Sequence, residues 1–345
     1  MKAVVYHGPG QKSWEPAPDP KIQQSGDAIV RITSSTICGT DLHILKGDVP
    51  EVRPGTVLGH EAVGVIEELG SASGSLKVGD RVLVPAITSD GNCDFCRQGM
   101  YSHCRDGGWV FGHLIDGLQA EYARVPHAAT SLHRVPEGVT DEQVLFLADI
   151  LPTSYECGVL NGEVKPGDMV AIVGAGPIGL AAVLLSRLYS PRAIIAIDLE
   201  ESRLERARQF GADLTIRGGS EEVKQRVMEL TNGQGVDVVM EAVGIPETFE
   251  LCTEIVKPGG RVANIGVHGK PVCLHLERLW SHNITIRTRL VDTVSVPQLL
   301  SLIQAGRLDP SPFVTHRFKL AEAMEAYDVF ARAGETGALK VVLQG

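Results

Sequence analysis

The segment Gly174–Gly179, which reads GAGPIG, constrains the fold of this chain more than any other. It follows an apolar run at Asp168–Gly174 that is typical of a buried strand, and it opens an apolar run at Leu180–Tyr189 that is typical of a helix. Glycines in such a turn let the backbone approach a pyrophosphate at the helix N-terminus. The segment therefore predicts a dinucleotide-binding turn. Its candidate cofactor-binding residues are Gly174, Gly176, Pro177, Ile178 and Gly179.

Strands and helices alternate on the C-terminal side of this turn. Ala193–Asp198 is a second apolar run, and Glu200–Phe210 is a charged helical segment. Asp237–Ala242 and Arg261–Gly266 continue as strands, with Pro246–Ile255 as a helix between them. This alternation predicts a parallel, doubly wound α/β sheet.

The residues on either side of this region have a different texture. Short β-branched or alternating runs, separated by Gly, Pro and Asp, predict strands at Val4–Tyr6, Ala28–Thr33, Ala62–Glu68 and Arg81–Pro85. The tail from about Val291 indicates one or two helices and a last strand at Lys340–Leu343. We expect a first domain at 1–150, a nucleotide-binding domain at 151–290, and a return to the first domain at 291–345.

The second strand of the nucleotide-binding domain ends in an acidic residue, Asp198. A carboxylate in this place accepts hydrogen bonds from the adenosine ribose and repels a 2′-phosphate, so NAD is favoured over NADP. Arg203 lies five residues further on and has two readings. It could offer a cation to that phosphate, or it could stack on the adenine or contact the ribose.

Composition excludes several classes of function. The formal net charge of −10 argues against nucleic acid and anionic membranes as partners. Seven cysteines, three of them within residues 93–104, do not form an even disulfide framework, so we expect a reducing, cytoplasmic location. The N-terminus has no apolar signal core. The longest uncharged stretch, Met169–Ser186, contains the glycine turn and is shorter than a membrane span.

Two short motifs carry metal-binding residue types, Cys38-Gly39-Thr40-Asp41 and Gly59-His60-Glu61. A thiolate, an imidazole and a carboxylate brought together form the kind of site that Zn²⁺ prefers. Each residue alone is more often a buried cysteine or a core histidine, and it is their combination that favours a metal site. A metal that polarises an oxygen, together with a hydride-carrying cofactor, indicates an oxidoreductase.

On these residues the chain resembles the zinc-dependent medium-chain alcohol dehydrogenases. The matching segments are CGTD at 38–41, GHE at 59–61 with Gly64 and Gly70, GDRV at 79–82, and the glycine turn. Within the family the chain is most similar to bacterial tetrameric secondary alcohol dehydrogenases, through Val84–Thr88 and through Asp149 with Thr153. The resemblance implies a Rossmann domain inserted into a mainly-β, GroES-like catalytic domain, and a homotetramer.

The resemblance also implies roles for individual residues. Cys38, His60 and Asp149 would hold a catalytic zinc, with Glu61 as an exchangeable fourth ligand and Asp41 orienting the imidazole of His60. The hydroxyl of Thr40 would meet the substrate oxygen, and His43 would pass the proton outward, unless His43 is only a solvated helix residue. The nicotinamide end would be lined by Thr153, Val243, Ile265, Val267 and Leu290. Trp109 is a candidate for the substrate pocket, although tryptophan is more commonly a core residue.

Asp90, Cys93, Cys96 and Cys104 follow the spacing of the family's cysteine lobe, with an aspartate where the family usually has a cysteine. Three thiolates and one carboxylate can close a tetrahedral structural zinc site. The alternative is a lobe without metal, and His103 is a possible substitute ligand.

Taken together, these residues and the resemblance imply a zinc- and NAD-dependent enzyme that interconverts alcohols, in particular secondary ones, and ketones or aldehydes by hydride transfer. A polyol, diol or amino-alcohol dehydrogenase of the same family is the alternative. A non-catalytic nucleotide-binding relative is more remote, because such relatives lose the Cys38 and His60 pair.

Overall fold

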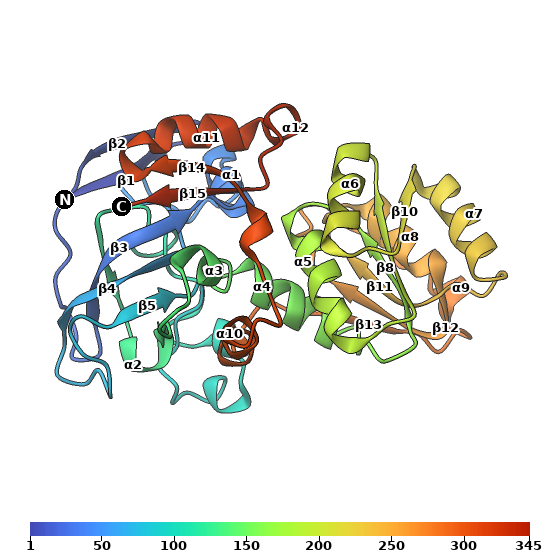
Figure 1. Ribbon diagram of the computed structural model, residues 1–345, viewed down its shortest axis with the longest axis horizontal. Coiled ribbons are helices and arrows are strands. Elements are labelled where there is room, and N and C mark those ends of the chain that lie inside the picture. The colour runs from blue at the N-terminus through green and yellow to red at the C-terminus, as the bar shows by residue number, and fades with distance from the viewer. The chain divides into compact units, whose positions relative to one another are not determined.

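The computed structural model describes all residues 1–345. The chain divides into two compact units, one formed by residues 1–149 and 292–345 and the other by residues 150–291 (Figure 1). All seven cysteines are free thiols. None of the helices combines the length and the apolar character that a bilayer crossing needs.

The unit of residues 150–291 is built on a six-stranded sheet with the order β10-β9-β8-β11-β12-β13. Its strands are β8 (Met169–Val173), β9 (Ala193–Asp198), β10 (Leu214–Arg217), β11 (Val236–Glu241), β12 (Val256–Asn264) and β13 (Thr285–Thr288). All neighbouring strands are parallel. The strand order reverses beside β8, which is fully buried and leads into the glycine turn. This reversal confirms the predicted doubly wound sheet.

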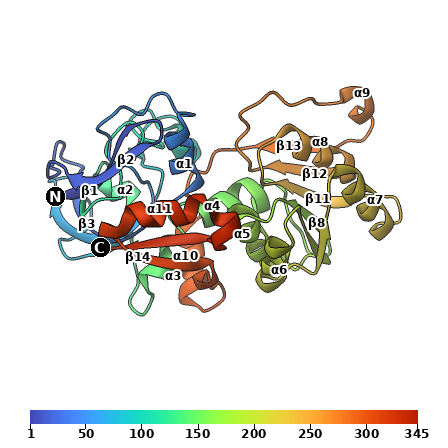
Figure 2. The ribbon, with the colours of Figure 1, turned by 90° about the horizontal axis from the view of Figure 1, so that it is seen from above.

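Helices cover both faces of this sheet. They are α4 (Ile150–Thr153), α5 (Pro177–Ser186), α6 (Glu201–Phe210), α7 (Ser220–Leu230), α8 (Pro246–Ile255) and α9 (Leu276–Leu279), with a π-helical segment at Ser154–Leu160 and a 3₁₀ turn at Arg187–Tyr189. The pair α5 and α6 lies on one face, and the pair α7 and α8 lies on the other (Figure 1, Figure 2). Alternate residues of β8, such as Ala171 and Val173, belong to one apolar core with Val223 of α7 and Leu251 of α8. The fully buried β8 is what a strand covered on both faces requires.

The unit of residues 1–149 and 292–345 is mainly β. Its larger sheet has the order β14-β15-β3-β4-β5-β7, with β6 also paired to β3, and β1 and β2 form a separate antiparallel pair. The strands are β1 (Lys2–Gly8), β2 (Gln11–Pro16), β3 (Ala28–Thr36), β4 (Ala62–Leu69), β5 (Arg81–Val84), β6 (Tyr122–Val125), β7 (His133–Arg134), β14 (Val314–Lys319) and β15 (Lys340–Gln344).

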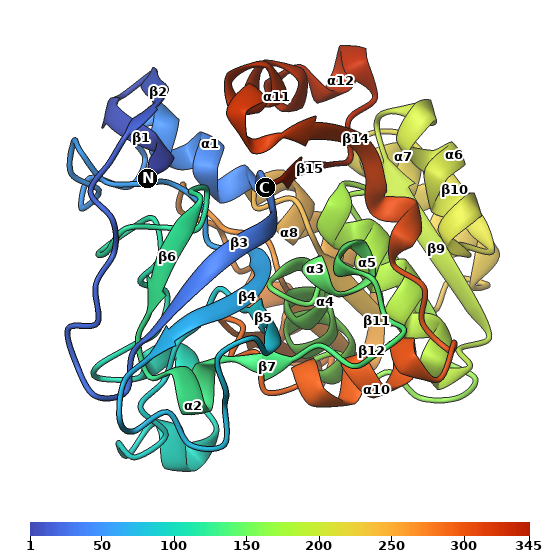
Figure 3. The ribbon, with the colours of Figure 1, turned by 60° about the vertical axis from the view of Figure 1, so that its left-hand side comes forward.

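The C-terminal strand of the chain, β15, lies inside this sheet between β14 and β3. β15 pairs antiparallel with β3, so that Val342 lies opposite Thr36, two residues before Cys38 (Figure 3). The helices of the unit are α1 (Gly39–Lys46), α2 (Ala128–Ser131), α3 (Asp141–Leu145), α10 (Val296–Gln304), α11 (Ala323–Ala331) and α12 (Ala333–Thr336). Short 3₁₀ turns occur at Cys96–Gln98, Tyr101–His103, Ser311–Phe313 and Leu320–Glu322. Residues from both ends of the chain therefore meet at the start of α1.

Candidate functional site

The first metal-binding motif lies where β3 passes into α1. Cys38 is the extended residue that precedes α1, and its backbone N–H donates to Oδ2 of Asp41 at 2.9 Å. This is the return bond of a capping box, in which the side chain of the third helical residue accepts from the free amide of the residue that precedes the helix. The cap holds both the Cys38 backbone and the Asp41 carboxylate in place.

The second motif leads into β4. Gly59 has φ of +92°, and a Cβ atom there would lie 2.5 Å from Cγ of Gln119. Only glycine combines this left-handed backbone with so close an approach. His60 and Glu61 follow it and are 3% and 1% exposed, so the turn places an imidazole and a carboxylate in the interior of the unit.

Four side chains converge at this point: Cys38, His60, Glu61 and Asp149 each offer a ligand atom, and these atoms lie within 4.8 Å of one another. Oδ2 of Asp149 is 3.6 Å from Sγ of Cys38 and 3.6 Å from Nε2 of His60. Ligands at zinc–donor distances of about 2.0–2.3 Å in a tetrahedron are about 3.3–3.8 Å apart. Oε2 of Glu61 is buried without a hydrogen-bond partner. A bound cation would satisfy this oxygen. The residues therefore fit a zinc ion.

Burial and charge shift the pKa values of these groups. Burial alone lowers the pKa of His60, but the neighbouring carboxylates of Asp149 and Asp41 raise it well above its usual value. Burial raises the pKa of the Cys38 thiol, and the Asp149 and Glu61 charges add to this increase. Burial also raises the pKa of Glu61, and the positive charge of Lys340 opposes that effect. A cation in the site would favour the ligand forms of all three residues, the thiolate, the neutral imidazole and the carboxylate.

A second cluster lies in the loop between β5 and β6. Asp90, Cys93, Cys96 and Cys104 bring their ligand atoms within 4.8 Å of one another. Backbone N–H groups of Cys93 and Asn92 donate to Oδ1 of Asp90 at 3.0 and 2.7 Å, and they lower the pKa of Asp90 to about 2. Three sulfurs and an ionised carboxylate suit a closed tetrahedral zinc site. His103 is exposed and is not a member of this cluster.

The glycine turn has the geometry that a pyrophosphate needs. Gly174 has φ of +100°, and a Cβ atom on Gly179 would lie 1.8 Å from the Gly174 carbonyl oxygen. Asp198, at the end of β9, accepts hydrogen bonds from Ala175 N at 2.8 Å and from Glu200 N at 3.0 Å. Nη1 of Arg203 is 3.7 Å from Oδ2 of Asp198. The predicted ribose carboxylate therefore lies beside the turn, with a cation next to it.

The residues expected to line the nicotinamide end belong to the same unit. Val243 and Val267 follow β11 and β12 and are 45% and 84% exposed, and Leu290 is 48% exposed. Ile265 is buried, and Thr153 is partly buried at the end of α4. In doubly wound sheets the ligand binds outside the carboxyl ends of the strands, where Val243 and Val267 lie.

Sequence reasoning missed Glu241, the last residue of β11. It is fully buried, and its Oε1 accepts hydrogen bonds from Val243 N and Gly244 N, both at 2.9 Å. This carboxylate holds the turn on which Val243 stands. An acidic residue ending an apolar strand is the signal that could have found it.

Of the remaining predicted residues, Thr40 and Trp109 lie beside members of the first metal cluster, and His43 lies on α1. Oγ1 of Thr40 is 3.8 Å from Sγ of Cys38. His43 is exposed, and its Nδ1 is 2.7 Å from Oδ2 of Asp48. The Trp109 ring stacks on His113, with centroids 4.3 Å apart, and meets His60 edge-on at 6.4 Å.

Three further residues of this region had no signal in the sequence motifs. They are Lys340, Gln119 and Tyr327, all 1% exposed or less. Nζ of Lys340 lies 2.8 Å from Oε1 of Glu61, and Gln119 donates to Oδ2 of Asp41 at 3.1 Å.

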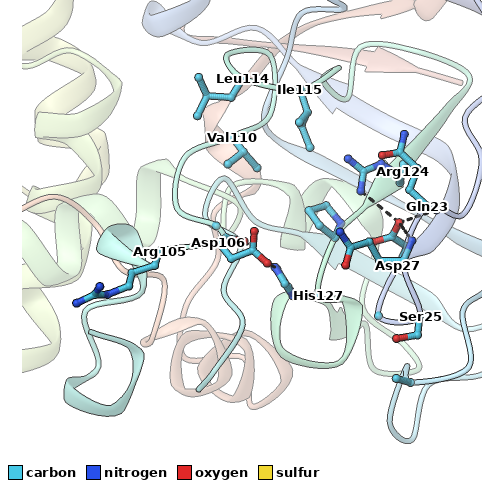
Figure 4. A pocket seen from close by; sticks show the side chains of 15 residues that line it. Gln23, Ser25, Asp27, Arg105, Asp106, Val110, Leu114, Ile115, Arg124 and His127 are labelled. Atoms are coloured by element: carbon cyan, nitrogen blue, oxygen red, sulfur yellow. Dashed lines mark hydrogen bonds and ion pairs between the residues drawn. The ribbon is translucent and has the colours of Figure 1, made fainter. Parts of the chain in front are cut away.

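A large cavity of the same unit, about 450 Å³ in volume, lies elsewhere and contains none of the predicted site residues (Figure 4). Among the residues that line it, Asp27 accepts from Arg124 at 3.2 Å, and Nε2 of His127 is 2.6 Å from the Asp106 carbonyl oxygen. These four residues therefore pair with one another at the wall of the cavity.

The chain matches known families over both units. Residues 24–137 match the alcohol dehydrogenase GroES-like domain, and residues 177–305 match the zinc-binding dehydrogenase domain. It is 40% identical to an alcohol dehydrogenase of Cupriavidus necator, over 100% of this chain and 98% of the relative. It is 33% identical to a probable NADP-dependent isopropanol dehydrogenase of Mycoplasma pneumoniae, over 94% of each chain. The solved structure of zinc-dependent alcohol dehydrogenase 2 from Streptococcus pneumonia is similar with a TM-score of 0.95 and 48% identity, over 100% of this chain and 98% of that one.

Proposed function

Because this chain belongs to the zinc-dependent medium-chain alcohol dehydrogenases, we propose that it interconverts secondary alcohols and ketones with NAD as the preferred cofactor. The activity class, oxidation of alcohols and the reverse reduction, follows from the family. The convergence of the Cys38, His60, Glu61 and Asp149 ligand atoms within 4.8 Å is the observation that carries the proposal.

Each residue of the first cluster has a proposed task. Cys38, His60 and Asp149 would hold a zinc ion, and Glu61 would exchange with the other ligands. When bound, zinc supplies a Lewis acid that lowers the pKa of an alcohol, and the nicotinamide supplies the hydride acceptor. The hydroxyl of Thr40 would accept a hydrogen bond from the alcohol and relay its proton, releasing its own hydroxyl proton as it takes the one that the alcohol loses. His43, exposed and hydrogen-bonded to Asp48, would transfer that proton to solvent.

The preference for NAD rests on the carboxylate of Asp198. Because this carboxylate lies at the end of β9 beside the glycine turn, a 2′-phosphate there would meet a like charge. The neighbouring Arg203 would moderate that repulsion, so we propose a preference for NAD rather than the exclusion of NADP.

A second candidate function, the oxidation of diols, is supported by two buried ring nitrogens that have no hydrogen-bond partner. Nε1 of Trp109 and Nε2 of His113 are buried without hydrogen-bond partners, and the Trp109 ring contacts His60. Unpaired buried polar groups favour a ligand that pairs them. This favours a substrate with a second oxygen, such as a vicinal diol or a hydroxyketone. A panel of 2-butanol against 2,3-butanediol, each with NAD and NADP, separates the two functions.

Removal of one ligand tests the metal site. Cys38→Ser should abolish turnover of every alcohol in the panel and lower the zinc content by about one ion per chain, as measured by elemental analysis. Cys273→Ser is the matched control, because Cys273 is an exposed cysteine outside both clusters. Full activity in protein stripped of all metal would contradict the proposal.

We further propose a second zinc in the Asp90 lobe, a homotetramer, and a cytoplasmic location. The lobe proposal is supported by the cluster geometry, and the location by seven free thiols. The tetramer is supported by the resemblance to tetrameric secondary alcohol dehydrogenases. Light scattering measures it directly, since one chain has a mass of 37.0 kDa.

A further inference from the structure

Two buried hydrogen bonds and one closer approach of charged groups connect helix α11 to the histidine of the first metal cluster. The hydroxyl of Tyr327 donates to Oε1 of Gln119 at 2.7 Å, and Nε2 of Gln119 donates to Oδ2 of Asp41 at 3.1 Å. Oδ1 of Asp41 faces Nδ1 of His60 at 3.6 Å. Tyr327, Gln119 and Asp41 are thus connected in series. All three side chains are 1% exposed or less.

The chemistry of the partners determines how the Gln119 amide is oriented. Its NH₂ group donates both to Oδ2 of Asp41 and to the carbonyl oxygen of Thr36, at 3.1 Å each. Both of these partners only accept hydrogen bonds, so a flipped amide would place an oxygen against two oxygens. The remaining amide oxygen must therefore take a donor, and Tyr327 supplies it. Burial, with the negative charge of Asp41, raises the pKa of Tyr327 well above its usual value, which keeps this hydroxyl a donor.

The amide in turn restricts the carboxylate of Asp41. Oδ2 receives two hydrogen bonds, from Gln119 and from the Cys38 backbone, which leaves Oδ1 directed at His60. At 3.6 Å, Oδ1 of Asp41 and Nδ1 of His60 are slightly beyond hydrogen-bond distance, and each is buried without a hydrogen-bond partner. A carboxylate that accepts from Nδ1 keeps the proton on that nitrogen and leaves the lone pair of Nε2 for a metal.

We propose that Gln119 and Tyr327 are positioning residues that act through Asp41 to orient His60 and thereby increase the zinc affinity of the first metal cluster. The inference rests on the proposed function, in which His60 holds the zinc. It gives Tyr327, which lies within the last 20 residues of the chain, a role in the metal site. It also explains why residue 59 is a glycine, since a Cβ atom there would collide with the Gln119 side chain.

Zinc release to a chromogenic chelator tests the proposal without relying on activity. Two zinc ions per chain should be released in two kinetic phases. The time course is measured for wild type and for His60→Ala, and the kinetic phase that is missing in His60→Ala is assigned to the first cluster. Gln119→Leu should speed that phase, or weaken zinc affinity, by about 10- to 100-fold. Tyr327→Phe removes one hydroxyl and should have a smaller effect of about 2- to 10-fold. The phase that belongs to the Asp90 lobe should stay unchanged in both variants.

Tyr155→Phe is the matched control. Tyr155 is also a buried tyrosine, and its hydroxyl forms a 2.7 Å hydrogen bond with that of Tyr189 in the other unit of the chain. It should lower thermal stability about as much as Tyr327→Phe and leave zinc release unchanged. In an Asp41→Ala background, Tyr327→Phe should have no further effect on zinc release, because its action passes through Asp41.

The outcomes separate the inference from the proposed function. If His60→Ala retains its full zinc content, the proposed metal site is wrong and the inference falls with it. If His60→Ala loses one zinc while Gln119→Leu and Tyr327→Phe release zinc like wild type, the metal site stands and the inference is overturned. If Gln119→Leu does not fold, Tyr327→Phe and its double variant with Asp41→Ala still decide between these results.

Discussion

The ammonium group of Lys340 lies 2.8 Å from Oε1 of Glu61, and each side chain is only 1% exposed. Nζ of Lys340 is also 3.4 Å from the carbonyl oxygen of Ile37. Burial by itself lowers the pKa of Lys340, but the charges of Glu61 and Cys38 raise it above its usual value. The ammonium group of a lysine from the C-terminal strand is thus paired with one member of the first metal cluster.

This ion pair predicts a large effect of a single substitution. Lys340→Met would leave Glu61 buried without a counter-charge, at a cost of about 3–5 kcal/mol in the free energy of unfolding. The urea midpoint of the variant should fall, and the double variant Lys340→Met/Glu61→Gln should recover much of the loss because no charge remains. Lys319→Met, at an exposed lysine of β14, is the control. Equal midpoints for wild type and Lys340→Met would contradict the prediction.

The cysteine lobe should affect stability rather than chemistry. Cys96→Ala removes a ligand of the second cluster, so the zinc content should fall by about one ion per chain and the thermal midpoint should fall. The kcat of the folded fraction should change little. Cys252→Ala removes a buried thiol outside both clusters and shows the cost of the cavity alone. Fresh wild-type protein with one zinc per chain would refute this assignment of the lobe.

Asp198 should determine the choice of cofactor. Wild type should favour NAD over NADP by roughly 5- to 150-fold in kcat/KM, which corresponds to about 1–3 kcal/mol. Asp198→Ser should weaken the use of NAD and improve the use of NADP, because the charge opposite the 2′-phosphate is removed. Arg203→Ala should reduce the remaining NADP activity if this guanidinium contacts the phosphate. A wild-type enzyme that prefers NADP would show that Asp198 has another role.

His133 predicts a pH dependence of stability that is separate from the metal clusters. Burial lowers the pKa of this partly buried histidine from 6.5 to about 4. Its contribution to stability is therefore complete above about pH 6.5. It is lost as the pH falls toward 4, because the unfolded chain binds a proton that the folded chain does not.

Comparison of unfolding at pH 7.5 and pH 5 checks this prediction. His133→Gln should lose about 1–2 kcal/mol less stability than wild type over that interval, allowing for the partial exposure of the side chain. Parallel pH profiles for the two proteins would exclude His133 as the cause.

Local sequence patterns determined most of the nucleotide-binding unit. The strand Ala193–Asp198 and the helix Pro246–Ile255 have the predicted bounds, since an apolar period bounded by Pro, Gly or Asp is a local property. Strand β12 begins at Val256 rather than at Arg261, because its first residues contain Pro and Gly and hide the pattern. Strand β2 was not predicted, since its residues are mostly half-buried and its pairing with β1 defines it.

The sequence by itself also determined which residue types are available for a metal, through the motifs at Cys38 and His60. Only the tertiary structure decided what surrounds them. Tyr327 and Gln119 are 208 residues apart, and Lys340 and Glu61 are 279 residues apart, so no local pattern connects them. A lysine that opens an apolar strand would ordinarily face solvent. The pairing of β15 with β3 places it instead in the interior, where Glu61 is the charge that can compensate it.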